Sequence, residues 1–349
     1  MDFKIADFDF AASSEVFIIA ELSANHNGSL DNALKTIEAV KRTGANAIKI
    51  QTYTADTITI DAKTQDFKID QGTIWDGKYL HDLYKEAYTP WEWHEKLFQK
   101  AKEMGLICFS SPFDKSAVDL LETFNVPAYK IASPEITDIP LIKYVASKGK
   151  PVIISTGIAG LADIELAISA CKKQGNDQIA LLKCTTSYPA PIEEADLSMI
   201  TDMRTRFEVI CGLSDHTMGV SAPIVATALG ARIIEKHFII DRSIGGPDAS
   251  FSLNETEFSA MVSSVRDAEK SIGKVDYTLT EKQEKSREFS RSLYVVKDAK
   301  AGDLVTEENV RSIRPGYGMH PKYLPEILSK RFAKDVKKGE RLTWNILDN

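Results

Sequence analysis

Two short apolar runs that end in ionisable residues constrain this chain more than any other feature. The first run, VICGLSDHT at 209–217, ends near His216, and the second, ARIIEKHFII at 231–240, carries Glu235 and His237. Side chains two apart on a strand face the same way, so Glu235 and His237 point together into whatever the strand lines. Burying both groups costs free energy unless something binds them, which predicts a ligand site here.

The two histidines form a candidate metal site. Neighbouring strands lie about 5 Å apart, so His216 and His237 can share one divalent ion if their strands are adjacent. Two histidines completed by oxygen ligands suit Mn²⁺ or Mg²⁺ better than a closed tetrahedral zinc site. Residue type and spacing leave one alternative open, namely two unrelated histidines that are hydrogen-bonded near loops.

The same pattern of a short apolar run followed by polar residues repeats along the chain. Eight such runs alternate with helical patterns between residues 16 and 271, which predicts a (β/α)8 barrel, with an open doubly wound sheet as the alternative. In a barrel, the carboxyl ends of the strands form one face, so we expect a single active site there. The polar residues at those ends are Glu21, Lys49, Gln51, Lys130, Ser133, Glu135, Ser155, Thr186, Tyr188, Ser214, His216, Glu235 and His237.

Two segments depart from this repeat. Residues 54–89 are long and polar, with Trp75 between Gly72 and Gly77, and we interpret them as a lid or substrate loop, or alternatively as a decorative insertion. After a barrel domain at 1–276 and a charged linker at 277–292, residues 293–349 predict a small, mostly β module that docks on something.

Composition describes an ordinary soluble globular protein. The chain is 43% hydrophobic and 27% charged, and its net charge of −7 gives no reason to expect nucleic acid as a partner. The four cysteines lack CxxC spacing and read as core residues in a reducing compartment. No secretory leader and no membrane span is recognisable, so we expect a cytoplasmic protein.

Several motifs together resemble the sialic acid synthase family. They are AELSANHNG at 20–28, IKIQTY at 48–53, YKIASPE at 129–135, ISTG at 154–157, CTTSYPAP at 184–191, GLSDHT at 212–217, EKHF at 235–238, GGPD at 245–248 and RPGYG at 314–318. The resemblance implies a (β/α)8 TIM barrel followed by an antifreeze-like (SAF) domain, in a homodimer that swaps this domain. It also implies condensation of phosphoenolpyruvate with an N-acetylated amino sugar. ASFSL at 249–253 resembles the pseudaminic acid synthase subgroup, whose sugar is 2,4-diacetamido-2,4,6-trideoxy-altrose.

The resemblance, with the chemistry of the residues, implies a role for each site residue. A divalent ion, Mn²⁺ before Mg²⁺ or Co²⁺, would sit on His216 and His237 and polarise the sugar aldehyde. Glu21, Glu135 and Glu235 would steady the cationic carbon and move protons. Phosphoenolpyruvate would bind Lys49, Lys130, Ser133, Ser155, Thr186 and Ser214. The sugar would bind Gln51, Tyr188, Asp248 and, from the partner's small domain, Arg314.

Other functions stay open at this point. Within the family, a legionaminic or N-acetylneuraminic acid synthase would use the same chemistry on a mannose-type sugar. Seven- and eight-carbon sugar phosphate synthases, which also condense phosphoenolpyruvate with an aldehyde, are a more distant alternative. The lack of an extra basic cluster for a sugar phosphate argues mildly against them. A non-catalytic sugar-binding or ice-binding protein would need no metal-polarising pair beside three carboxylates.

Overall fold

The structure is a computed structural model in which residues 3–348 are described. These residues divide into two compact units, one ending at Gly273 and the other beginning at Lys274. Within the described residues, no helix is both long enough and apolar enough to cross a bilayer.

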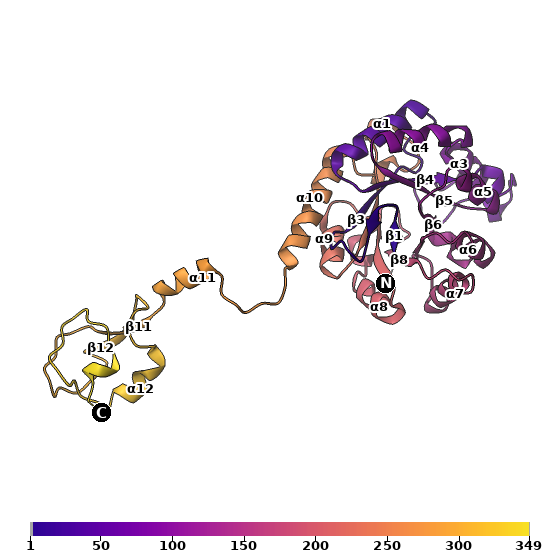
Figure 1. The fold of residues 1–349 in the computed structure, drawn as a ribbon. Coiled ribbons are helices and arrows are strands. Elements are labelled where there is room, and N and C mark those ends of the chain that lie inside the picture. Colours follow the sequence, from indigo (N-terminus) through magenta and orange to yellow (C-terminus); the bar gives the residue numbers. More distant parts are fainter. Residues whose placement is uncertain (1–2, 349) are drawn as a thin grey trace. The chain divides into compact units, whose positions relative to one another are not determined.

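The first unit is a closed barrel of eight parallel strands (Figure 1). Because β10 pairs with both β3 and β9, the sheet closes on itself, so the predicted (β/α)8 barrel is confirmed and the open sheet is wrong. The strands, in their order around the barrel, are β10 Ile233–His237, β3 Phe17–Glu21, β4 Ala47–Thr52, β5 Ile107–Pro112, β6 Tyr129–Ile131, β7 Val152–Ser155, β8 Ile179–Cys184 and β9 Ile210–Asp215.

Helices surround the strands and bury an apolar face on them. Their ends follow ordinary capping rules: the Ser29 hydroxyl accepts a hydrogen bond from the Asn32 amide, and Asn254 with Glu257 forms a capping box. The helices of this layer are α1 Leu30–Thr43, α4 His94–Glu103, α5 Lys115–Thr123, α6 Ile139–Ala146, α7 Leu161–Lys172, α8 Ser198–Phe207, α9 Ser221–Ala228 and α10 Glu255–Ile272.

An N-terminal hairpin that the sequence did not predict covers one end of the barrel. Strands β1 Lys4–Ile5 and β2 Phe8–Asp9 pair antiparallel, and Phe3 and Phe10 are buried beside them. These rings pack with Phe17 and other inward residues from the amino-terminal parts of the strands. The lower interior of the barrel is therefore a filled apolar core.

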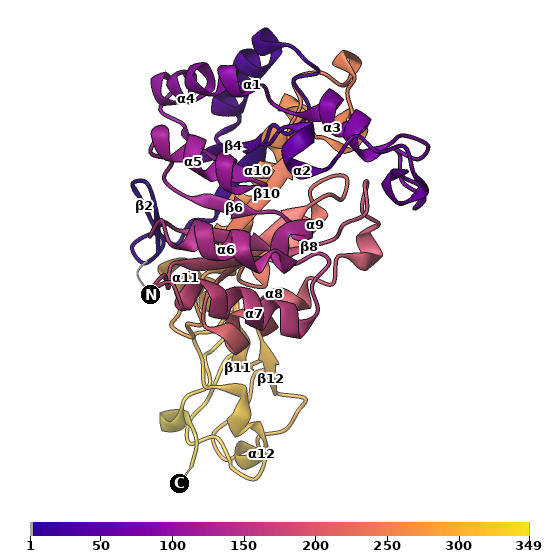
Figure 2. The ribbon, with the colours of Figure 1, turned by 90° about the vertical axis from the view of Figure 1, so that its right-hand side faces the viewer.

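Residues 54–89 form the connection between β4 and α4. They contain α2 Ala55–Ile58, the 3-10 turn η1 Gln65–Phe67 and α3 Leu80–Ala87. Figure 2 shows the part between α2 and α3 as a projecting loop of the barrel unit. The remaining 3-10 turns of this unit are η2 Trp91–Trp93, η3 Ser133–Thr137, η4 Ile192–Glu194, η5 Arg242–Ile244 and η6 Ala249–Phe251.

The second unit contains a small antiparallel sheet with its own apolar core. Strand β11 Ser292–Val295 pairs with β12 Val310–Ile313, and isolated bridges extend the pairing, as the predicted small β module requires. Its helices and turns are α11 Glu281–Ser286, η7 Arg287–Phe289, η8 Pro321–Tyr323, α12 Leu324–Ile327 and η9 Trp344–Ile346.

Candidate active site

The candidate site is the upper half of the barrel interior, where inward-facing positions change from apolar to charged. On β3 the inward residues run from Phe17 and Ile19, both in the apolar core, to Glu21. Strand register then sets Glu21 level with Lys49 on one side and His237 on the other. Period-two alternation therefore carries these side chains into one chamber, as the sequence predicted for Glu235 and His237.

Two buried lysines and two buried glutamates form the floor of this chamber. The Lys49 ammonium is ion-paired with Glu21 and lies 3.7 Å from Oε1 of Glu235. The Lys130 ammonium lies 3.6 Å from the same Glu235 oxygen and donates a hydrogen bond to the Ser155 hydroxyl at 2.6 Å. Ser214 donates to Glu235 at 3.1 Å. The formal charges of the four groups cancel, which makes their common burial tolerable.

Burial and charge act in opposite directions on these groups. Burial alone raises the pKa of Glu235, but Lys130 and Lys49 outweigh it and bring that pKa below its ordinary value. Burial lowers the pKa of Lys130, and Glu235 only partly opposes this. A further anion beside Lys130 would offset the cost of its burial, so this part of the chamber is suited to an anionic ligand.

The loop after β6 contributes Ser133 and Glu135 through η3. The Ser133 hydroxyl accepts a hydrogen bond from the Gly157 amide at 3.0 Å. A Cβ on Gly157 would lie 2.5 Å from the Thr186 methyl group, so only glycine permits this approach. Burial raises the pKa of Glu135 to about 7, and its Oε2 is buried without a hydrogen-bond partner. Glu135 can therefore exchange a proton near neutral pH.

His216 and His237 lie side by side, with ring centroids 5.3 Å apart. Nδ1 of His216 is 2.8 Å from the Thr185 carbonyl oxygen, which can only accept, so Nδ1 carries a proton and Nε2 is the nitrogen available to a cation. Nδ1 of His237 is buried without a hydrogen-bond partner, 3.8 Å from an Asp248 carboxylate oxygen. Burial holds the pKa of His237 well below its ordinary value, so the ring is neutral. Two adjacent histidine rings beside a carboxylate offer the nitrogen and oxygen ligands that fit a divalent cation.

Another histidine-carboxylate group lies in the 54–89 segment. Asp61, His81 and Asp82 are close enough together to hold a metal. The Lys63 ammonium, however, forms ion pairs with both Asp61 and Asp82. This group is thus already ion-paired with a lysine and is not the predicted pair.

The residues predicted to contact the sugar fall in two places. The Gln51 amide donates to the Ser23 hydroxyl at 3.0 Å, and the Tyr188 ring lies 4.5 Å from that of His216. Asp248 accepts from the Ala24 amide at 3.4 Å, so these three residues surround the chamber mouth. Arg314 is exposed and follows β12 in the second unit, outside the barrel unit.

Sequence reasoning missed four residues of the chamber. Ser111 accepts a hydrogen bond from Lys49 at 3.2 Å, and Ser23 accepts from Gln51. The ring centroids of Phe251 and His237 are 5.0 Å apart, and those of Trp75 and Tyr188 are 5.3 Å apart. The serine pair at the end of the strand ICFSSP was an available signal for Ser111, whereas no local pattern indicates the contacts of Phe251.

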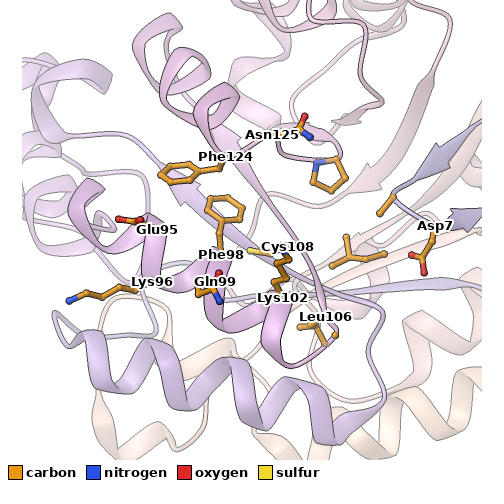
Figure 3. Close-up of a pocket in the computed structure, with 14 residues that line it drawn as sticks. Asp7, Glu95, Lys96, Phe98, Gln99, Lys102, Leu106, Cys108, Phe124 and Asn125 are labelled. Atoms are coloured by element: carbon orange, nitrogen blue, oxygen red, sulfur yellow. The ribbon is translucent and has the colours of Figure 1, made fainter.

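A cavity of about 930 Å³ opens at the opposite end of the barrel. It is lined by residues that lead into β5 and β6 and by the β1–β2 turn at Asp7. Figure 3 shows the rings of Phe98 and Phe124 there, stacked with centroids 5.0 Å apart. None of the predicted site residues lines this cavity, so it is separate from the candidate site.

Comparison with known proteins identifies the family. The model of the NeuB family matches residues 36–277, and that of the SAF domain matches residues 290–347. The pseudaminic acid synthase of Campylobacter jejuni is 48% identical over 96% of this chain and 97% of its own length. The pseudaminic acid synthase of Helicobacter pylori is 44% identical over 93% of this chain and 96% of its own length.

A solved structure agrees with these sequence matches. The N-acetylneuraminic acid (sialic acid) synthetase of Leptospira borgpetersenii is 30% identical, with a TM-score of 0.73 over 82% of this chain and 95% of its own. The predicted resemblance to sialic acid synthases and the predicted SAF domain are thus confirmed. The chain is a member of the NeuB family, with a SAF domain after its barrel.

Proposed function

We propose that this chain is a pseudaminic acid synthase, a transferase acting on phosphoenolpyruvate. It condenses phosphoenolpyruvate with the open-chain aldehyde of 2,4-diacetamido-2,4,6-trideoxy-altrose and gives a nine-carbon nonulosonic acid and phosphate. The observation that carries this proposal is the 48% identity to a pseudaminic acid synthase over 96% of the chain, against 30% to a sialic acid synthetase. The ASFSL stretch at 249–253 supports the same subgroup.

Phosphoenolpyruvate binds at the floor of the chamber. Its carboxylate and phosphate form ion pairs with the Lys49 and Lys130 ammonium groups. The Ser155 and Ser214 hydroxyls rotate and donate hydrogen bonds to it. Ser133 and Thr186, which meet at Gly157, form the adjoining wall. The lowered pKa of Lys130 supports this assignment, because a bound anion stabilises its charge.

A divalent cation, Mn²⁺ before Mg²⁺ or Co²⁺, is held by His216 and His237. When bound, it supplies positive charge next to the aldehyde oxygen and makes the carbonyl carbon electrophilic enough for an enol carbon. The neutral state of His237 and its unpartnered buried Nδ1 support this role. Asp248, 3.8 Å from that nitrogen, is available as an oxygen ligand or as an acceptor for a sugar hydroxyl.

The glutamates handle the charge that appears after carbon-carbon bond formation. The former enol carbon becomes cationic, and Glu21 and Glu235 face it from the floor and stabilise it electrostatically. Water then adds to this carbon, with Glu135 taking its proton, and phosphate leaves by cleavage of the carbon-oxygen bond. The pKa of Glu135, about 7, suits this exchange.

The sugar lies toward the mouth, against Gln51, Tyr188 and Asp248. We further propose that Arg314 of a second copy completes this subsite in a homodimer with a swapped SAF domain. Sedimentation of the full chain against a chain ending at Arg287 tests the dimer. Four buried unpaired cysteines suit a reducing compartment, and we propose that the enzyme works in the cytoplasm.

The test is phosphate release from phosphoenolpyruvate with Mn²⁺ and three sugars. These are the trideoxy-altrose, its mannose isomer and N-acetylmannosamine. Turnover with the altrose sugar alone supports the proposal. Preference for a mannose-type sugar would favour a legionaminic or N-acetylneuraminic acid synthase, and no turnover with any sugar would favour a non-catalytic binding protein.

A further inference from the structure

The 54–89 segment reaches the candidate site through one side chain. Trp75 is half-buried and lies in a turn that the Asp76 carboxylate closes by accepting hydrogen bonds from the Gly72 and Thr73 amides. The Trp75 indole nitrogen donates to the Pro247 carbonyl at 3.0 Å, within the Gly-Gly-Pro-Asp turn. Two segments far apart in the sequence are thus joined at the mouth of the chamber.

Trp75 belongs to an aromatic cluster that begins at the two histidines. Tyr188 packs on His216, and Phe251 packs on His237 at 5.0 Å. The Tyr188 and Phe251 centroids are 5.2 Å apart, and Trp75 covers both, at 5.3 Å and 6.5 Å. Trp75 is therefore the outer layer, and the histidines are the inner layer, of one continuous aromatic wall.

The layout of the chamber decides which end of the sugar meets this wall. Glu235 and Ser214 lie two positions before His237 and His216 on their strands, and Glu21 and Lys49 are level with His237, so phosphoenolpyruvate lies below and beside the histidines. The aldehyde carbon reacts beside the histidines, so the rest of the sugar extends toward the mouth. Five carbon-carbon bonds of about 1.5 Å carry its far end roughly 6 Å outward. The ring centroids are 4.5 Å apart from His216 to Tyr188 and 5.3 Å apart from Tyr188 to Trp75, so a methyl group about 6 Å outward comes within van der Waals contact, about 4 Å, of the Trp75 ring.

We propose that Trp75, seated on Phe251 and Tyr188, contacts the C6 methyl group of the sugar and selects against sugars that carry a hydroxyl there. The inference rests on the proposed function. The trideoxy-altrose presents a methyl group at C6, where ordinary amino sugars present a hydroxymethyl group. Burying the methyl group against an aromatic face is favourable in free energy. A hydroxyl in the same place would lose its water and find no hydrogen-bond partner on that face. An apolar wall discriminates in this way by about 100-fold at most.

The experiment compares two sugars that differ only at C6. They are 2,4-diacetamido-2,4,6-trideoxy-altrose and its 6-hydroxy counterpart, 2,4-diacetamido-2,4-dideoxy-altrose, and the readout is kcat/KM for each with phosphoenolpyruvate and Mn²⁺. The wild type prefers the deoxy sugar, and Trp75→Ala lowers this preference about tenfold. Trp75→Phe retains most of the preference, because a ring remains after the hydrogen bond to Pro247 is lost.

The matched control is Ile74→Ala, which removes an exposed apolar side chain from the same turn. It leaves the preference unchanged, and thermal unfolding verifies that all variants are folded. An equal loss of kcat/KM on both sugars in Trp75→Ala would overturn the inference alone, since Trp75 would then only anchor the turn. A wild type inactive on the deoxy sugar would overturn the proposed function and this inference together.

Discussion

The lower and upper halves of the barrel interior are built by the same strands but bury different kinds of side chain, apolar in the lower half and charged in the upper half. The lower half is a dry core in which Phe17 and Phe109 pack with the rings of the N-terminal hairpin. The upper half buries Lys130 and Glu235, with 3.6 Å between the Lys130 ammonium nitrogen and Oε1 of Glu235. Apolar burial stabilises the fold, whereas a buried ion pair contributes little net stability. One half therefore stabilises the barrel, while the other holds groups for chemistry.

The largest expected effect concerns the upper half. Lys130→Met lowers kcat/KM for phosphoenolpyruvate by about 10³-fold, because a charge that faces the substrate is lost. Steady-state phosphate release measures this. Lys183→Met is the control, since Lys183 is also buried at a strand end but donates only to the Cys184 carbonyl. Equal losses in both variants would show that the charge facing the upper interior has no special role in catalysis.

A core substitution in the lower half should affect stability and not chemistry. Phe109→Ala lowers the free energy of unfolding by about 3–5 kcal/mol, because the fully buried ring leaves a cavity. Denaturant titration measures the loss, and kcat per folded molecule stays close to that of the wild type. A variant with normal stability and lost activity would contradict the division between the halves.

A third prediction concerns the outward face of the same strands. Lys236 forms a buried ion pair with Asp215 and also donates to the Thr217 carbonyl, so it fixes the loop that carries His216. Lys236→Met weakens Mn²⁺ binding about 10- to 100-fold, because groups behind a ligand orient it. Calorimetric titration with Mn²⁺ measures this, and Lys183→Met again serves as the control. Unchanged Mn²⁺ affinity would show that charges facing outward do not support the site.

The smallest effect is a pH dependence. Because burial raises the pKa of Glu135 from 4.5 to about 7, kcat/KM rises with pH around 7 if the carboxylate takes a proton. The folded state binds this proton more tightly, so the contribution of Glu135 to stability falls as pH rises from 4.5 to 7. In Glu135→Gln both dependences disappear. If kcat/KM of this variant still rises with pH near 7, the dependence belongs to another titrating group.

Local pattern was sufficient for much of the site. The alternation of Ile233 to His237 predicted which side chains share a face, and the eightfold repeat predicted that strand ends meet. It was not sufficient for Ser111, whose hydrogen bond from Lys49 depends on the register between β4 and β5. Nor did it indicate the N-terminal hairpin, because two-residue strands leave almost no periodic signal.

The barrel, the small second module, the family and the set of strand-end residues could all be predicted from the amino-acid sequence. These depend on hydrophobic periodicity and on motifs, which are local properties of the chain. Tertiary structure alone decided that Lys49 and Lys130 share Glu235 and that Trp75 covers Phe251 across 176 positions of the chain. Such contacts depend on how closed strands and loops pack in space, and sequence spacing carries no record of that distance.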